Sequence, residues 1–119
     1  FGTADEAKRV EELMGSLRPF DGRVRLTVEG GVNRAPLERT AGVARLFEHA
    51  RRLAARLGFE LGERSVGGAS DGNFAAALNV PVLDGLGVEG DGAHAEHEHI
   101  LVSDLARRGA LLAGLVATL

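Results

Sequence analysis

The sequence predicts an α/β protein, because helix patterns and strand patterns alternate along its 119 residues. Apolar residues recur at helical spacing in several long segments, and short apolar runs lie between them. Glycine accounts for 17 residues, about twice its usual share, and many of these glycines separate the short runs. Apolar runs bounded in this way are typical of strands in a buried parallel or mixed sheet.

A helix and then a strand are expected at the start of the chain. Thr3 and Glu6 have the spacing of a capping box, so we expect a helix over residues 4–18. Residues 23–29 alternate polar and apolar side chains, the pattern of a strand with one buried face. The composition changes near Pro36, which predicts a boundary between two structural units at about this point.

The remainder of the chain is expected to hold three helices and several buried strands. A helix over residues 40–57 has a regular apolar face and ends at Gly58, and His49 lies on its polar face. The strands are expected at residues 59–61, 65–66, 80–83 and 100–102, and the other helices at residues 72–78 and from Ser103 or Asp104 onward. The apolar face expected for the last helix consists of Leu105, Gly109, Leu112, Leu115, Val116 and Leu119.

Composition and charge exclude several functional classes. The net charge is −3 and no run of Lys or Arg is present, so nothing favours nucleic acid as a partner. The longest apolar run, residues 110–119, is too short to cross a membrane. Cysteine is absent, which excludes disulfides and thiolate metal sites, and we expect a cytoplasmic location. Because the chain begins with Phe1, we expect it to be a piece of a longer protein.

A glycine-rich stretch, GGASDGN at residues 67–73, allows two interpretations. Residues 68–72 fit G-x-S-x-G, the turn that exposes the nucleophile of α/β-hydrolases, and Asp84 and His94 follow Ser70 in the required order. The chain is too short for that fold, however, so a serine hydrolase is the least favoured reading. We prefer a turn that leads into a helix capped by Ser70 or Asp71, with backbone N–H groups that bind a carboxylate or phosphate.

A second polar stretch, GDGAHAEHEHI at residues 90–100, contains three histidines and two glutamates close together. His97 and His99 would point the same way on a strand, and His94 precedes them. Imidazole and carboxylate groups at this density are typical of zinc or another divalent ion. An exposed polar loop without a ligand is the alternative, and the residues by themselves leave both open.

The two stretches together resemble the C-terminal part of a zinc exopeptidase family. The stretches GGASDGNFAAALNVPVLDGLG and GAHAEHEHILV, followed by an amphipathic helix, carry the resemblance. Members include glutamate carboxypeptidase, acetylornithine deacetylase, succinyl-diaminopimelate desuccinylase and aminoacylase. The resemblance implies that residues 1–35 end a ferredoxin-like α/β lid, or dimerisation, domain. It also implies that residues 36–119 form the C-terminal half of an α/β catalytic domain.

The resemblance also implies roles for individual residues. His94 matches a histidine that binds one of two zinc ions, and Glu98 matches a supporting glutamate later in the same motif. Gly68 and Ala69 match a turn whose N–H groups hold the substrate carboxylate, and Asp71 matches a structural cap at the helix start. The resemblance assigns no role to His97 or His99.

The family's other functional residues have no counterpart in this chain. These are an H-x-D motif, a bridging aspartate, a Glu-Glu pair that includes the general base, and a further acidic ligand. The implied activity is hydrolysis of an amide bond next to a free carboxylate, in an N-acyl or N-carbamoyl amino acid or at a peptide C-terminus. We therefore expect no catalytic residue and no activity in this chain alone. The resemblance also implies a homodimer of the parent protein, formed through the lid.

A non-catalytic function is the main alternative. In that reading the chain is a small α/β module that binds an anion or a metal, the metal through His94, His97 and His99. Such a module could also associate with another chain, because the first helix and residues 23–29 would expose apolar faces.

Overall fold

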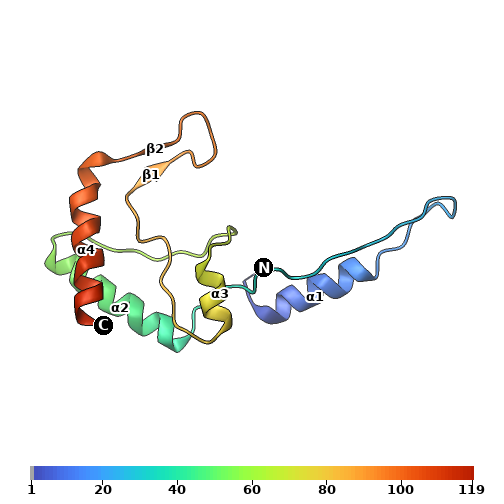
Figure 1. Ribbon diagram of the computed structural model, residues 1–119, viewed down its shortest axis with the longest axis horizontal. Helices are drawn as coiled ribbons and strands as arrows, with labels where there is room; N and C mark the ends of the chain where they lie inside the picture. Colours follow the sequence, from blue (N-terminus) through green and yellow to red (C-terminus); the bar gives the residue numbers. More distant parts are fainter. Residues whose placement is uncertain (1) are drawn as a thin grey trace. The chain divides into compact units, whose positions relative to one another are not determined.

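The computed structural model describes residues 2–119, which form helices and one small antiparallel sheet (Figure 1). The helices are α1 (Ala4–Gly15), α2 (Ala41–Arg56), α3 (Gly72–Ala77) and α4 (Leu105–Thr118). The strands are β1 (Gly90–Asp91) and β2 (His99–Ile100), and a 3-10 turn at Val102–Asp104 leads directly into α4. This mixture of helices and a small sheet is consistent with the expected α/β class. Among residues 2–119, no helix has the length and hydropathy required to cross a membrane.

The chain divides into two compact units. The first contains residues 2–40 and Ser65–Val82, and the second contains Ala41–Arg64 and Leu83–Leu119. Each unit is assembled from two separate segments, so the chain passes from the first to the second and back before it ends in the second. The predicted division of lid and catalytic domains at residue 35 stays a prediction.

The start of α1 has the predicted cap with one change in its partner. The Thr3 side chain accepts a hydrogen bond from the Glu6 N–H at 3.2 Å, as a capping box requires. The Glu6 carboxylate accepts the N–H of Gly2 at 2.8 Å rather than that of the cap residue itself. Within the first turn of α1, the Glu6 N–H is therefore satisfied by a side chain close in sequence.

The segment after α1 runs back alongside the helix (Figure 1). The Glu11 carboxylate accepts the Val32 N–H at 3.3 Å, and Glu38 accepts the Ala4 N–H at 2.7 Å. The strand predicted at residues 23–29 is not present, because no second strand in the described residues pairs with it. A strand is defined by its hydrogen-bonded neighbour, which an alternating pattern does not supply.

Asn73 connects the two segments of the first unit. Its side chain is only 8% exposed, and its Nδ2 donates to the Ala35 carbonyl at 2.7 Å. Its Oδ1 accepts the Ser70 N–H at 2.9 Å. One side chain thus joins the linker before α2 to the turn before α3, across 38 positions of sequence.

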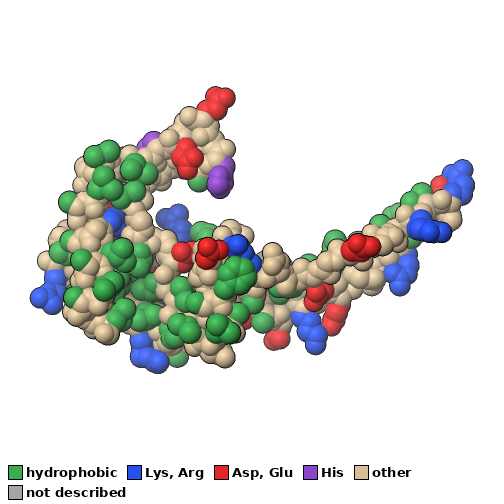
Figure 2. Space-filling view, viewed as in Figure 1, with side chains coloured by type: hydrophobic (Ala, Val, Ile, Leu, Met, Phe, Trp, Pro, Cys, Tyr) green, Lys and Arg blue, Asp and Glu red, His purple; other side chains and the backbone are tan. Residues whose placement is uncertain are grey.

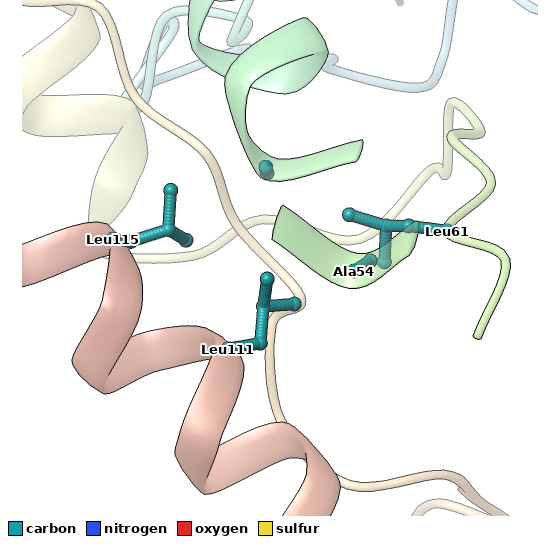
Figure 3. Close-up of a cluster of buried hydrophobic side chains, with 5 residues drawn as sticks. Ala54, Leu61, Leu111 and Leu115 are labelled. Atoms are coloured by element: carbon teal, nitrogen blue, oxygen red, sulfur yellow. The ribbon is translucent and has the colours of Figure 1, made fainter. Parts of the chain in front are cut away.

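The core of the second unit is the contact between α2 and α4 (Figure 3). Leu111 and Leu115 lie one turn apart on α4 and face Ala54 and Leu61 in Figure 3. Small residues allow the two helices to approach closely, since the Leu53 side chain lies 3.6 Å from the place of a Cβ at Gly114. The buried cluster comprises Ala50, Ala54, Leu61, Leu111 and Leu115, and it is flanked by Phe47, Leu53, Phe59, Leu83 and Leu86.

The predicted apolar face of α4 is wrong except at Leu115. The face buried against α2 centres on Leu111, which the prediction omitted, because the helix is apolar on more than one side. The exposed apolar side chains of α4 are Leu105, Leu112, Val116 and Leu119. Figure 2 shows apolar side chains gathered on the visible surface over this helix.

The predicted strands between Gly58 and Val102 are mostly absent. Residues 59–61, 65–66 and 80–83 form no ladder in the described chain, and only the prediction at 100–102 overlaps a strand, β2. A buried parallel strand requires a neighbour on each side, and the described residues supply none for these segments.

The ends of α2 and α3 are set by residues in the left-handed conformation. Gly58 has φ +83°, and the Phe59 N–H donates to the Ala54 carbonyl at 3.1 Å, which is a Schellman motif. Asn79, with φ +62°, ends α3 in the same way, with the Val80 N–H bonded to Ala75 at 3.2 Å. The predicted end of α2 at Gly58 is therefore confirmed.

His49 is not the solvated residue that its polar neighbours predicted. It is half-buried, and its Nε2 lies 2.7 Å from the Thr118 hydroxyl near the end of α4. The Thr118 hydroxyl donates its only proton to the Gly114 carbonyl at 2.7 Å. His49 therefore donates from Nε2, which gives α2 and α4 a polar link beside their apolar contact.

Asp104 is a buried carboxylate, 2% exposed, and every hydrogen bond it accepts comes from its own unit. Its Oδ2 accepts the Glu89 N–H at 2.9 Å and the Arg108 side chain at 3.1 Å. Its Oδ1 accepts the Arg107 side chain at 2.6 Å. The Glu89 N–H, followed by the two guanidinium groups, lowers the pKa of Asp104 below its ordinary value of 3.8, although burial opposes this shift.

Replacing Asn73 by Ala should destabilise the first unit by about 1–3 kcal/mol, because the Ser70 N–H and the Ala35 carbonyl lose their partner. Urea unfolding followed by circular dichroism at 222 nm measures this, since the chain has neither Trp nor Tyr. The control is Asp71→Asn, where the side chain is 92% exposed and the expected change is within about 0.5 kcal/mol. Equal effects of the two variants would contradict the role given to Asn73.

Asp104→Asn should destabilise the second unit at neutral pH and have little effect in acid. Because the folded-state pKa is lowered, the stabilisation is complete above the unfolded-state pKa and is lost as pH falls through the folded-state value. The free energy of unfolding of both proteins should be measured at pH 7 and at a series of pH values below 3.8, and the difference between them should shrink as the pH falls. Asp84→Asn, at an exposed position of the same unit, serves as the control and should follow the parent at every pH.

Candidate functional site

The glycine-rich turn at residues 67–73 is closed by hydrogen bonds among its own residues. The Ser70 hydroxyl accepts the Gly72 N–H at 3.1 Å, while Asn73 accepts the Ser70 N–H. A Cβ at Gly72 would lie 3.0 Å from Val82 and 3.5 Å from Leu37, so this glycine allows close packing. Two of the N–H groups that the sequence offered to an anion are therefore already bonded.

Gly68 and Ala69 are exposed at the start of this turn. Neither N–H takes part in a hydrogen bond within the described part of the chain. A Cβ at Gly68 would meet open space, so its backbone can be approached from outside. These two N–H groups are among the backbone donors that remain for a ligand at this turn.

The Asp71 side chain does not cap α3, so of the two predicted caps, Ser70 and Asp71, the one at Asp71 is wrong. Asp71 occupies the N-cap position, but its side chain makes no capping hydrogen bond. Its carboxylate instead lies 3.3 Å from the guanidinium of Arg34, which itself stacks 4.8 Å from the ring centre of Phe74. The Ser70 hydroxyl instead accepts the N–H of Gly72, the first residue of α3, which leaves Asp71 with a surface ion pair.

The serine-hydrolase interpretation gains no support from the turn. A nucleophilic serine needs a general base that accepts its proton, most often histidine. The Ser70 hydroxyl is held by the Gly72 N–H, and the first unit contains no histidine. Asp84 and His94 both belong to the second unit.

The histidine-rich stretch forms a hairpin in the second unit. Gly90 pairs with Ile100 and Asp91 with His99, so residues 92–98 form the loop. Two turns shape this loop, closed by the Ala95 N–H bonded to Gly92 at 2.8 Å and the Glu98 N–H bonded to Ala95 at 3.0 Å. The loop is therefore a defined structure, with histidine side chains at its surface (Figure 2).

Backbone conformation fixes the position of His94 in this loop. Its φ is +67°, the left-handed region that few residues other than glycine adopt. Gly92 has φ +72°, and the His97 ring occupies the space where a Cβ would lie. Gly92 is thus required both for its conformation and for the approach of His97, while His94 remains exposed.

The described residues do not by themselves fit a metal centre. His94, His97, Glu98 and His99 are all exposed, and His99 Nδ1 lies 3.0 Å from the His97 carbonyl. Within residues 2–119, no group of three or more His, Asp or Glu side chains could hold a metal ion. The convergence of His94, His97 and His99 expected for a metal-binding module is therefore wrong. A catalytic zinc needs about three protein ligands, and His94 could supply one.

Sequence reasoning missed Asn73 and Glu89, and it named Asp104 only as a possible cap of the last helix. Asp104 does occupy the N-cap position of α4, but its side chain makes no capping hydrogen bond and accepts the Glu89 N–H instead. Asp104 had a readable signal, because Arg107 and Arg108 follow it at the i+3 and i+4 spacing of helical ion pairs. The contact of Asn73 with Ala35 and that of Glu89 with Asp104 had none, since only the folded chain brings these groups together.

Comparison with known proteins supports the resemblance at the level of the family. The family described as peptidase family M20/M25/M40 matches residues 10–118, which include both the glycine-rich turn and the hairpin. No curated protein and no solved structure matched the chain. Members of this family are peptidases and related hydrolases, generally dependent on metal. The match covers nearly the whole sequence, and on this evidence the chain belongs to peptidase family M20/M25/M40.

Proposed function

We propose that the chain is the C-terminal part of a zinc-dependent hydrolase that cleaves an amide bond next to a free carboxylate. The observation that carries the proposal is the family match, which spans GGASDGN and the hairpin with G-A-H-A-E-H-E in one alignment. The proposed substrates are N-acyl or N-carbamoyl amino acids or the C-terminal residue of a peptide. Glutamate carboxypeptidase, acetylornithine deacetylase, succinyl-diaminopimelate desuccinylase and aminoacylase are the activities to test first.

His94 is the proposed metal ligand of this chain. Its exposed imidazole stands on a shaped loop, and the ligand set is completed by residues outside these 119. Bound zinc would polarise the scissile carbonyl and activate water. Glu98 lies at the end of the same loop, and its proposed supporting role rests on the match of the motif alone.

Gly68 and Ala69 are the proposed contacts for the substrate carboxylate. Their N–H groups are exposed and carry no hydrogen bond within the described residues, so they can donate to an anion. Ser70 and Gly72 are excluded from this role because their N–H groups are bonded inside the turn. Fewer backbone N–H groups of this turn are therefore available to the substrate than the sequence alone indicated.

Two unpartnered surfaces support a larger parent protein. The backbone of residues 25–31 makes no hydrogen bond in the described chain, although Leu26 and Val28 alternate as in a strand. The second apolar side of α4 is likewise exposed. Partner strands of a lid domain and further catalytic-domain elements would cover these groups. Without the missing elements the chain has one proposed metal ligand, His94, and no general base, so we propose that it is inactive alone. We also propose that the parent protein dimerises through the lid domain.

In the full-length hydrolase, His94→Ala should remove bound metal and lower kcat/KM by more than the roughly 10–100-fold that loss of an outer-shell partner costs. The measurements are zinc content by mass spectrometry and hydrolysis of an N-acyl amino acid. His97→Ala is the matched control, since it changes a neighbouring exposed histidine of the same loop. Retention of zinc and activity in His94→Ala would exclude the assigned role.

Ala69→Pro should raise KM for substrates that carry a free carboxylate, because proline has no N–H to donate. The expected increase is about tenfold, the effect of losing one hydrogen bond to a charged group. The same variant should bind the corresponding amide-capped substrates as the parent does, and Ala69→Gly keeps the N–H as a control. An equal change in KM for both substrate types would point to a general distortion of the turn instead.

A further inference from the structure

Glu89 joins the hairpin to the helix that follows it. Its carbonyl accepts the Leu101 N–H at 2.7 Å, which continues the pairing of β1 with β2 by one step. Its N–H donates to the Asp104 carboxylate at 2.9 Å. The residue before β1 is therefore fixed both to the residue after β2 and to the entry of α4.

The Asp104 carboxylate is itself held in one orientation. Arg107 and Arg108, on the first turn of α4, each donate to a different oxygen of it, at 2.6 and 3.1 Å. Their guanidinium groups stack on Phe59, 4.7 and 5.6 Å from the ring centre, and Phe59 packs against the α2–α4 core. The carboxylate is thus attached to the most rigid part of the second unit.

The hairpin needs this attachment because its own ladder is short. β1 and β2 have two residues each, and an isolated two-stranded hairpin is marginally stable in water. The loop above it also holds His94 at positive φ, which a residue other than glycine keeps only where its surroundings enforce it. Some contact outside the ladder must therefore maintain the loop.

We propose that Asp104 is a positioning residue that holds the loop of residues 92–98, and His94 with it, in one orientation relative to α4. The link runs from the α2–α4 core through Phe59 and the two arginines to Asp104, and from there to the Glu89 N–H at the base of the hairpin. The benefit to metal binding rests on the function proposed above, whereas the ordering of the loop does not.

Hydrogen exchange followed by mass spectrometry on the full-length protein tests the ordering. Asp104→Ala should accelerate amide exchange in residues 89–101 by about tenfold or more relative to α2, because a charged acceptor of a backbone N–H is lost. Leu111→Ala weakens the core to which the link is anchored but removes no hydrogen bond of Asp104, so it should accelerate exchange in α2 and in the hairpin alike. Asp104→Asn keeps an acceptor oxygen, should give an intermediate value, and replaces the alanine variant if that one does not fold.

The inference is overturned if the Asp104 variants, like Leu111→Ala, accelerate exchange in the hairpin no more than in α2. Zinc content then separates the two proposals. Loss of zinc in Asp104→Ala with partial recovery in Asp104→Asn supports the positioning role. A hairpin that exchanges faster but keeps its full zinc content shows that Asp104 does not position His94 for metal binding. Full zinc content in His94→Ala would instead refute the proposed function and leave the ordering of the loop by Asp104 standing.

Discussion

The close approach of α2 and α4 is the constraint on which the second unit depends. Ala50 and Ala54 lie fully buried on α2, and Leu53 packs over Gly114 on α4, so small residues leave room for the leucines of α4 between the two helices. Leu111 fills the contact completely. Protein interiors tolerate few voids, so this pairing fixes where α4 begins and hence where Asp104 lies. The position of the hairpin follows from the helices rather than from its own four strand residues.

Polar groups organise the loops that the apolar core does not reach. Among the described residues, every buried side-chain nitrogen or oxygen has a hydrogen-bond partner. Asn73 and Asp104 are the two buried polar residues, one in each unit, and each binds the backbone of a loop. Leaving such groups unpaired costs more than a typical hydrogen bond contributes, so they specify one loop conformation over others. The two candidate loops are ordered in this way despite their many glycines.

Local signals predicted the helices well and the sheet poorly. Thr3, Gly58 and the spacing of apolar residues on α2 are effects within a few residues, so they could be read directly. Strands depend on neighbours, and residues 23–29 and 80–83 have the composition of strands without a partner in the described chain. The same distinction applies to the site. His94, Gly68 and Ala69 are candidates because they match a motif, whereas the contacts of Asn73 with Ala35 and of Glu89 with Asp104 join groups that are distant in sequence.

The bare backbone of residues 25–31 has a consequence for handling this polypeptide. A row of free N–H and C=O groups beside exposed Val24, Leu26 and Val28 is a template onto which another strand can add. Copies of the chain can therefore recruit one another along this edge at the concentrations used for purification. A charged residue at Leu26 or a proline at Val28 would act as a gatekeeper against such growth, and either change lies far in sequence from both candidate loops.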